Sequence, residues 1–332
     1  MAAALVALAV GAAAGAQGDE PRIVHVFAER YDAFPAAVQM RNRTLVIAFR
    51  TGAGHIGDDG KIMVARSRDG GKTWSPSLAV DAPGIDDRTS DGLTQLRDGT
   101  LILTFFQLVW APDHSSNEAR GFFVTSRSGG RTWSRAQPVT IRRSPWVALY
   151  GRIVELRDRT LLQPAYILDN DELVSVLLQS KNRGKSWSVR STLARAHNET
   201  SVLPLTQRRF LAFMRGSHSV PWISQVVSRD AGKTWSAPRR IFPEGASPDA
   251  LRLKNGHLLL CVSDRTANPG VRCHVSADAK AWSAGKLIKR GTNADMGYPS
   301  SVQLGDGSIF TAYYNDAWHI DAAIYRERFL RD

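Results

Sequence analysis

Short apolar runs on either side of a polar turn recur along most of the chain. The turns are rich in Asp, Asn and Gly, and the runs beside them are rich in Leu, Ile, Val, Phe and Thr. Turns such as Asp-Gly and Asn-Gly can adopt positive φ, so two apolar runs around one of them indicate a β-hairpin. The runs are too short and too often interrupted for helices. The pattern predicts six hairpins: "QMRNRTLVIAF" from Gln39, "QLRDGTLILTF" from Gln95, "ELRDRTLLQPA" from Glu155, "PLTQRRFLAFM" from Pro204, "RLKNGHLLLCV" from Arg252 and "QLGDGSIFTAY" from Gln303.

A second pattern, a polar stretch ending in Trp, alternates with the hairpins. Its copies recur at nearly regular intervals and start at Ser67, Ser126, Ser180, Ser228 and Ser276. Units of about 50 residues, each with about four short strands, match a radial β-propeller better than a sandwich. The expected fold class is therefore all-β, a six-bladed β-propeller. Because this stretch has no sixth copy, we expect an N-terminal strand around "RIVHVF" (22–27) to complete the last blade and close the ring.

The repeated stretch, which we call the octet turn, is best interpreted as a structural turn. Its copies are "SRDGGKTW", "SRSGGRTW", "SKNRGKSW", "SRDAGKTW" and the shorter "SADAKAW". Ser and Asp side chains can bond nearby backbone amides, Gly supplies unusual dihedral angles, and Trp anchors the turn on the blade. An active site needs different groups that converge once, so repetition argues for a structural role of Asp69 and Asp230.

Composition favours a globular protein with a basic surface. The 332 residues are 43% hydrophobic and 22% charged, and 43 Lys and Arg against 31 Asp and Glu give a net charge of +12. Such a charge suits anionic partners. However, the basic residues are scattered, without a Lys/Arg-rich run, zinc-finger spacing or RNP-type motif, which favours anionic glycans over nucleic acid. No spacing implies a metal or an organic cofactor.

The start of the chain, residues 1–18, resembles a signal segment. A short apolar run ends in small residues with an A-x-A pattern at Ala14 to Ala16, although the basic start of such segments is missing. The run is too short to cross a membrane stably, and no other stretch is apolar enough. We therefore expect an exported protein, secreted or periplasmic, with one propeller domain over residues 19–332, no membrane span and a monomeric state.

Two cysteines, Cys261 and Cys273, lie in apolar segments separated by the turn "SDRTANPG". Neighbouring strands could bring them together, so one disulfide bridge and two buried free thiols are both open. Neither cysteine has the His or Cys neighbours that a metal site needs.

The octet turn, Ser-x-Asp-x-Gly-x-Thr-Trp, resembles the Asp-box, or BNR repeat, of the sialidase (neuraminidase) superfamily, and the resemblance covers nearly all of the chain after the signal segment. It implies a six-bladed propeller with the Asp-boxes at the blade rim, away from the substrate. Family sialidases use three arginines to hold a substrate carboxylate, a Tyr-Glu pair as nucleophile and base, and an Asp as acid/base. The anomeric carbon already bears a carboxylate, so a neutral phenol approaches it more easily than a carboxylate nucleophile, unlike the usual two-carboxylate glycosidases.

Four residues resemble the family's site in context and spacing. Tyr298, in "DMGYPSSVQLGDG", resembles the nucleophile, and Glu199, in "HNETSVLPL", resembles its base. The interval from Glu199 to Arg215 is similar to that from the family's base to its second arginine. The interval from Arg265 to Tyr298 is similar to that from the third arginine to the nucleophile. A phenol needs such a base because its ordinary pKa is near 10, and forked guanidinium groups suit a carboxylate.

The first hairpin leads into a loop that resembles the family's acid/base segment, "FRTGAGHIGDDG". Arg50 would contact substrate there, and Asp58 or Asp59 would be the acid/base, with Asp58 preferred. His55 is an alternative proton carrier or a hydrogen-bond donor to substrate, because imidazole titrates near neutral pH.

Two positions depart from the family. Ala33 stands where the first arginine is expected, and Ala317 where the glutamate that steadies it is expected. A missing cation beside a carboxylate weakens binding by about 1.5–3 kcal/mol. Arg30, Arg88 and His319 are candidates to compensate.

The resemblance implies an exo-acting retaining glycoside hydrolase, an exo-α-sialidase or a relative that acts on another acidic sugar. Two alternatives stay open: a non-catalytic propeller that binds glycan or protein, and an enzyme of different chemistry on the same scaffold, such as a lyase.

Overall fold

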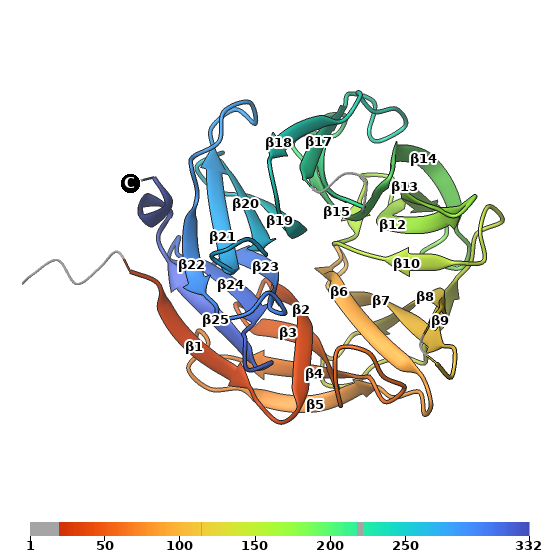
Figure 1. Ribbon diagram of the computed structural model, residues 1–332, viewed down its shortest axis with the longest axis horizontal. Coiled ribbons are helices and arrows are strands. Elements are labelled where there is room, and N and C mark those ends of the chain that lie inside the picture. Colours follow the sequence, from red (N-terminus) through yellow and green to blue (C-terminus); the bar gives the residue numbers. More distant parts are fainter. Residues whose placement is uncertain (1–19, 114, 218–221, 332) are drawn as a thin grey trace, which may run out of the picture.

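Six antiparallel sheets surround a central axis in the computed structural model, which describes residues 20–113, 115–217 and 222–331 (Figure 1). Three of the sheets consist of β2 (Tyr31–Gln39), β3 (Leu45–Gly52), β4 (Lys61–Ser67) and β5 (Ser75–Val80); of β6 (Asp86–Gln95), β7 (Leu101–Trp110), β8 (Asn117–Ser126) and β9 (Gln137–Val139); and of β10 (Val147–Leu149), β11 (Val154–Glu155), β12 (Leu161–Asp169), β13 (Glu172–Ser180) and β14 (Ser188–Arg195). The other three consist of β15 (His197–Pro204), β16 (Phe210–Gly216), β17 (Ile223–Ser228) and β18 (Arg239–Phe242); of β19 (Ala246–Arg252), β20 (Leu258–Asp264), β21 (Gly270–Ser276) and β22 (Lys286–Arg290); and of β23 (Gly297–Gln303), β24 (Ile309–Tyr314), β25 (Ile320–Tyr325) and β1 (Arg22–Phe27). The predicted all-β, six-bladed propeller is confirmed.

The ring closes through the N-terminal strand, as predicted. β1 pairs with β25 in antiparallel register from Arg22↔Ile324 to Phe27↔Ile320, so the last sheet joins both ends of the described chain. A short 3-10 helix, η1 (Glu327–Leu330), follows β25. The described residues contain no helix with the length and apolar character that a membrane span requires. The segment expected to be a signal, residues 1–18, lies outside the described residues.

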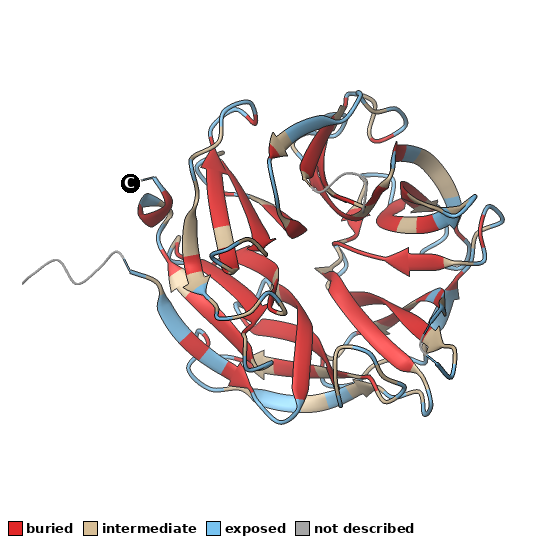
Figure 2. Cartoon of the chain, in the orientation of Figure 1, coloured by how far each residue is buried: buried red, intermediate tan, exposed pale blue. Residues whose placement is uncertain are grey.

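In the five four-stranded sheets, each predicted hairpin joins the inner strand to its neighbour in the sheet, and in four of these sheets an octet turn links the third strand to the fourth. In the five-stranded sheet, the hairpin joins β11 to β12 and the octet turn joins β13 to β14. Inner strands are buried along most of their length, whereas outer strands such as β5 are largely exposed (Figure 2). Because strand direction alternates, the hairpin turns and the octet turns lie at one end of the sheets. The starts of the inner strands lie at the other end, which we call the site end.

The octet turns are built as their composition predicts. Asp69 accepts bonds from the amides of Lys72 and Thr73, both at 3.0 Å, and the amide of Gly71 donates to Ser67 Oγ at 2.8 Å. The Trp side chains pack on the preceding sheet: Trp74 lies 6.0 Å from Phe310, Trp187 6.5 Å from Phe123 and Trp282 5.6 Å from Phe213, between ring centroids. The turn therefore joins two neighbouring blades.

Polar side chains from four sheets meet at the axis. Arg152, between β10 and β11, donates to Asp249 Oδ1 at 2.6 Å and to Ser300 Oγ at 2.9 Å, and it pairs with Asp91 at 2.9 Å. Removing one partner from such a buried network leaves an uncompensated charge. The cluster fixes the inner strands relative to each other.

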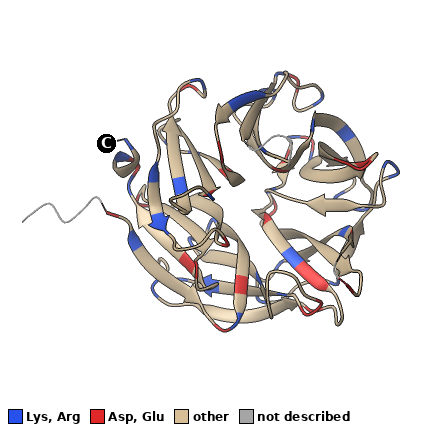
Figure 3. Ribbon diagram, in the orientation of Figure 1, with Lys and Arg blue, Asp and Glu red and all other residues tan. Residues whose placement is uncertain are grey.

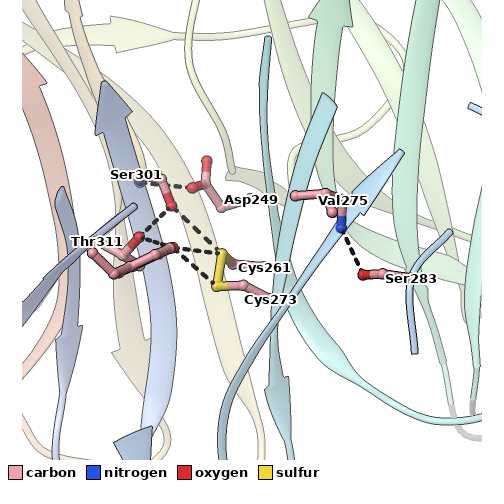
Figure 4. Close-up of a disulfide and its surroundings, with 8 residues drawn as sticks. Asp249, Cys261, Cys273, Val275, Ser283, Ser301 and Thr311 are labelled. Atoms are coloured by element: carbon pink, nitrogen blue, oxygen red, sulfur yellow. Dashed lines mark hydrogen bonds between the residues drawn. A yellow bond between two sulfur atoms is a disulfide. The ribbon is translucent and has the colours of Figure 1, made fainter. Parts of the chain in front are cut away.

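Cys261 and Cys273 form a disulfide, which decides between the two states that the sequence left open. They are direct partners in the β20–β21 ladder, with Cα atoms 4.0 Å apart, and both are fully buried. Ser301 Oγ of the neighbouring sheet lies 3.7 Å from Cys261 Sγ (Figure 4).

Candidate active site

Three inner strands carry the same irregularity at the site end. Ladder register shifts between Ala33 and Ala36, between Ala246 and Asp249, and between Gly297 and Ser300. In each bulge the residue before a proline has positive φ: Phe34 at 56°, Ser247 at 50° and Tyr298 at 50°. A bulge re-aims a side chain, and positive φ costs about 1–3 kcal/mol for a residue other than glycine. The fold thus stores strain at these three positions, where the Phe34 and Tyr298 rings pack with centroids 4.8 Å apart and Ser247 contacts Glu199.

Glu199 lies at the centre of this arrangement, near the start of β15, and is only 5% exposed. The Tyr298 hydroxyl donates a short hydrogen bond to Glu199 Oε1. Glu199 Oε2 accepts from Arg215 Nη1 at 3.2 Å, from the Ser247 amide at 3.0 Å and from Ser247 Oγ at 3.1 Å. Both carboxylate oxygens are therefore occupied and the carboxylate is held in one orientation.

Charges around the pair separate the two protonation states. Burial raises the pKa of Glu199, but Arg215, the Tyr298 hydroxyl and Arg265 outweigh it and bring this pKa below its usual value. Burial and the negative charge of Glu199 raise the pKa of Tyr298 to about 12, although Arg215 and Arg265 oppose them. The resting pair is a carboxylate that accepts from a neutral phenol.

Two predicted arginines lie near this pair. Arg215, at the end of β16, is ion-paired with Glu199 and lines the cavity described next. Arg265 follows β20 directly, and its Nε is buried without a hydrogen-bond partner among the described residues. Because Arg265 contributes to the pKa values of both Glu199 and Tyr298, its charge acts on the same site.

A cavity of about 250 Å³ opens beside the Tyr298–Glu199 pair. Four of the predicted residues line it: Arg88, Glu199, Arg215 and Tyr298. Much of the remaining wall is apolar or aromatic, from Phe34, Phe106, Leu108, Trp146, Tyr166 and Leu173. A few polar groups that converge in an apolar concavity are typical of a small-molecule site.

Arg50 is placed differently from the prediction. Its side chain is fully buried, and Nε donates to Asp86 Oδ1 at 2.5 Å. Gly52 and Gly60 allow this packing, because a Cβ at Gly52 would lie 2.8 Å from Arg50 Nη2 and one at Gly60 2.0 Å from Asp86 Oδ1. Arg50 does not line the cavity. Its charge is paired with that of Asp86, a partner that the sequence did not indicate.

Arg88 shares the same carboxylate and reaches the cavity. It donates to Asp86 Oδ2 at 2.8 Å and to the carbonyl of His55 through a short hydrogen bond. Its guanidinium lies 5.2 Å from the centroid of the Phe34 ring. Of the three residues expected to compensate for the absent arginine, Arg88 is the one that lines the cavity, whereas Arg30 pairs with Asp59 at 2.6 Å and the His319 ring contacts His25.

The two acid/base candidates differ in their surroundings. Asp59 pairs with Arg30 and accepts from the Ala53 amide at 3.0 Å. Burial opposes these contacts, but together with Arg50 they keep the pKa of Asp59 below its usual value. Asp58 is exposed and has no hydrogen bond to another described residue. Neither carboxylate lines the cavity.

His55 belongs to a polar cluster that the sequence did not reveal. Its Nδ1 lies 3.0 Å from Asp295 Oδ1 and 2.7 Å from the Tyr31 hydroxyl, and the Tyr314 hydroxyl donates to Asp295 at 2.9 Å. Burial would raise the pKa of Asp295, but His55 and the tyrosines lower it to about 2. The position of Asp295, shortly before Tyr298 in the chain, was the one available signal. The Phe34 ring contacts both His55 and Tyr298, with centroids 5.4 Å and 4.8 Å from theirs. Tyr314 of this cluster also lies next to Tyr298, with ring centroids 6.1 Å apart.

The two departures from the family pattern are now located. Ala33 is fully buried and faces Arg50 in the β2–β3 ladder, and the next residue, Phe34, lies against Tyr298. Ala317 is exposed in the turn after β24. The described residues contain no group of three or more His, Cys, Asp or Glu side chains able to hold a metal ion.

Known proteins resemble this chain in both repeat and fold. The model of a family described as a BNR repeat-like domain matches residues 86–311, and a BNR/Asp-box repeat matches residues 65–76. A sialidase of Bacteroides fragilis (strain YCH46) is 24% identical in an alignment 300 residues long, which covers 77% of this chain and 54% of the relative. A sialidase of Clostridium perfringens is 24% identical in an alignment 202 residues long, which covers 52% of each chain. The chain thus spans about half the length of these curated relatives.

Solved structures with the same fold cover nearly all of the chain. A protein of unknown function from Dyadobacter fermentans DSM 18053 matches with a TM-score of 0.79 and 23% identity, over 91% of this chain and 97% of its own. The Hadza microbial sialidase Hz136 matches with a TM-score of 0.74 and 18% identity, over 90% of this chain and 66% of its own. At these identities the likeness concerns the fold.

Proposed function

Because the chain belongs to the BNR repeat-like domain family, within the sialidase superfamily, we propose that it is a retaining glycoside hydrolase of the sialidase type. The observation that carries the proposal is the hydrogen bond from the Tyr298 phenol to the buried carboxylate of Glu199. The sialidases among its relatives, at 24% identity, support the same class of activity.

In the proposed first step, Tyr298 Oη attacks the anomeric carbon and gives its proton to Glu199. The bond from this carbon to the glycosidic oxygen breaks, and Asp58, or alternatively Asp59, donates a proton to the departing oxygen. Glu199 suits the role of base because it is ionised and already accepts from the phenol.

In the second step, water attacks the anomeric carbon and gives a proton to the acid/base carboxylate. Tyr298 Oη leaves and recovers its proton from Glu199. Two displacements at one carbon restore the original configuration, as in other retaining glycosidases.

The substrate proposed is a terminal acidic sugar, with sialic acid as the first to test. Arg215 and Arg88 line the cavity, and Arg265 adds a positive charge near it. Cations of this kind orient a carboxylate and stabilise negative charge in a site of low polarity. The small cavity beside Tyr298 suits one sugar ring, in agreement with exo action.

Two observations favour a second candidate function, a propeller that binds glycan without cleaving it. Ala33 replaces an arginine, and Arg50 is enclosed with Asp86 instead of lining the cavity. Such a protein would keep the glycan site and lose turnover.

A fluorogenic sialoside, tested beside a panel of other aryl glycosides, distinguishes the candidates. We expect turnover of at least one acidic glycoside and, with a slow fluorinated analogue of that sugar, a mass increase on the peptide that contains Tyr298. Turnover with the label on a carboxylate residue would contradict the mechanism. Glycan binding without turnover on any glycoside would favour the second candidate.

A further inference from the structure

The cavity beside Tyr298 is the first of three neighbouring cavities. A second cavity, of about 600 Å³, shares Asn198 and Arg215 with it. A third, of about 640 Å³, shares Arg240, Pro243 and Glu244 with the second. Because neighbouring cavities share lining residues, the three lie in a row that begins at the Tyr298–Glu199 pair. We call the second and third cavities together the outer groove.

The outer groove follows the seam between two neighbouring sheets. One wall comes from β18 and the residues after it, and the other from β20, β21 and the octet turn that begins at Ser276. It is therefore a feature of the blade interface, and its floor includes side chains from both sheets, such as Phe242 and His274, whose rings stack with centroids 3.9 Å apart.

Positive charge lines this groove throughout. Its cations outnumber its carboxylates: the cations are Arg215, Arg239, Arg240, Arg265, Arg272 and Lys280, and the carboxylates are Glu244 and Asp264. Figure 3 shows basic residues on both walls, on β18 and on β21. Asp264 is already paired with Arg272 at 2.8 Å, so little negative charge remains to neutralise the other cations.

Three of these cations have no hydrogen bond to another described residue through their side chains: Arg240, Arg265 and Lys280. The Nε of Arg265 is buried without a partner, which leaves a desolvated donor at the point where the groove meets the site. Arg240 lies over the ring of Trp222, 5.2 Å from its centroid. A guanidinium on an aromatic face keeps its N–H groups free to bind carboxylate or sulfate.

We propose that the outer groove binds an anionic oligosaccharide whose sugars, beyond the one held at Tyr298, carry carboxylate or sulfate groups. This inference rests on the proposed function, because a groove that leads out of a glycosidase site is placed to hold the rest of the glycan. The cations suit these anionic groups, and the Arg240 guanidinium, which lies over the Trp222 ring, keeps its N–H groups available to them. A nucleic acid has only its negative charge in common with such a glycan.

Binding is tested by calorimetry without any need for turnover. The probes are a hexamer of galacturonate, a chondroitin sulfate hexasaccharide, maltohexaose as the neutral glycan and a single-stranded DNA of matched charge. We expect at least one anionic glycan to bind at least tenfold more tightly than maltohexaose and than the DNA. The galacturonate and chondroitin sulfate arms distinguish carboxylate from sulfate recognition.

The matched variants remove two charges each. Arg240→Ser with Lys280→Ser should weaken binding of the anionic glycan at least tenfold and lower its salt dependence. Arg68→Ser with Lys72→Ser, in the octet turn of another sheet, should change it less than twofold. An equal loss of glycan affinity in both variants, or DNA bound as tightly as the glycan, would overturn the inference.

An inactive protein that binds the glycan through Arg240 and Lys280 would support the binding role of the groove and contradict only the proposed hydrolysis. An active protein that binds no anionic glycan would overturn only the groove.

Discussion

The Tyr298 phenol and the Glu199 carboxylate are hydrogen-bonded although they lie on different sheets, far apart in the chain. Each changes the protonation of the other. The charge of Glu199 raises the pKa of Tyr298, and the hydrogen bond from Tyr298 lowers that of Glu199. The pair is arranged to move a proton from phenol to carboxylate when the phenol attacks.

Replacing Glu199 with Gln should separate the two effects. Turnover should fall by roughly 10²–10⁴, the usual contribution of a general base. The pKa of Tyr298 should fall below its value of about 12, because the negative charge that raises it is removed while Arg215 and Arg265 remain. Ultraviolet titration measures this pKa, and Tyr298→Phe, which removes the titrating group and should abolish turnover, identifies the signal. Unchanged turnover in either variant would refute the mechanism.

Arg215→Met should move the acidic limb of the pH profile. Arg215 is the strongest of the influences that lower the pKa of Glu199, so without it this pKa rises. Since the base acts when ionised, kcat/KM should begin to fall at a higher pH than in the unmodified protein. In that protein, the lowered pKa also means that Glu199 stabilises the fold above its unfolded pKa and loses this contribution as the pH falls through its folded value.

A matched control for this variant is Arg195→Met, which removes a guanidinium paired at 2.5 Å with Glu172. Its pH profile should be unchanged. If both variants or neither shifted the acidic limb, the coupling between Arg215 and Glu199 would not control the base.

The sequence predicted the strands far better than the packing between them. Hairpin turns can be recognised from their composition, so a local pattern was sufficient to predict them. Glu199 and Arg215 lie within one hairpin, so a local pattern was also sufficient to place these two residues together. Nothing in the sequence indicated the positive φ at Phe34 and Tyr298, because neither residue is glycine. The pairing of Arg50 with Asp86 joins two different sheets, which only the assembled ring brings together. Contacts of that kind decide which arginines face the cavity.

The acid/base residue can be identified by the leaving group. Asp58→Asn should slow hydrolysis of an alkyl glycoside by roughly 10²–10⁴, and that of an aryl glycoside with an acidic phenol much less, because such a phenol departs without a proton. Asp59→Asn breaks the pair with Arg30 and should slow both substrates to a similar and smaller extent. The reverse pattern would assign the role to Asp59. If neither variant depends on the leaving group, the proton comes from another residue, and His55→Gln should then be tested in the same way.

Removal of the disulfide should lower stability and leave the site intact. Cys261→Ala with Cys273→Ala should reduce the free energy of unfolding by about 2–4 kcal/mol, as expected for a short closed loop. The backbone hydrogen bonds of the β20–β21 ladder keep the two strands paired. The Tyr325 hydroxyl, which lies 3.4 Å from Cys273 Sγ, keeps its hydrogen bond with the Thr311 hydroxyl at 2.8 Å. Urea titration measures the change, with the unmodified protein under a reductant as the control. Loss of turnover in the folded variant would show that the disulfide positions the site.

The octet turn offers its own internal control for a pH-dependent contribution to stability. A hydrogen bond from Thr73, then those from Ser67 and Lys72, hold the pKa of Asp69 well below its usual range. Asp69 therefore stabilises the turn above its unfolded pKa, near 4, and this contribution is lost as the pH falls through the folded pKa.

In the turn that begins at Ser126, Ser128 takes the position that matches Asp69 and accepts a hydrogen bond from the Thr132 amide at 2.8 Å. At neutral pH, Asp69→Ser should hence unfold at a higher temperature than Asp69→Ala, and both should lose less stability than the unmodified protein between neutral pH and about pH 3. Equal melting temperatures for the two variants would mean that the acceptor at this position does not hold the turn, and that the Trp packing alone does.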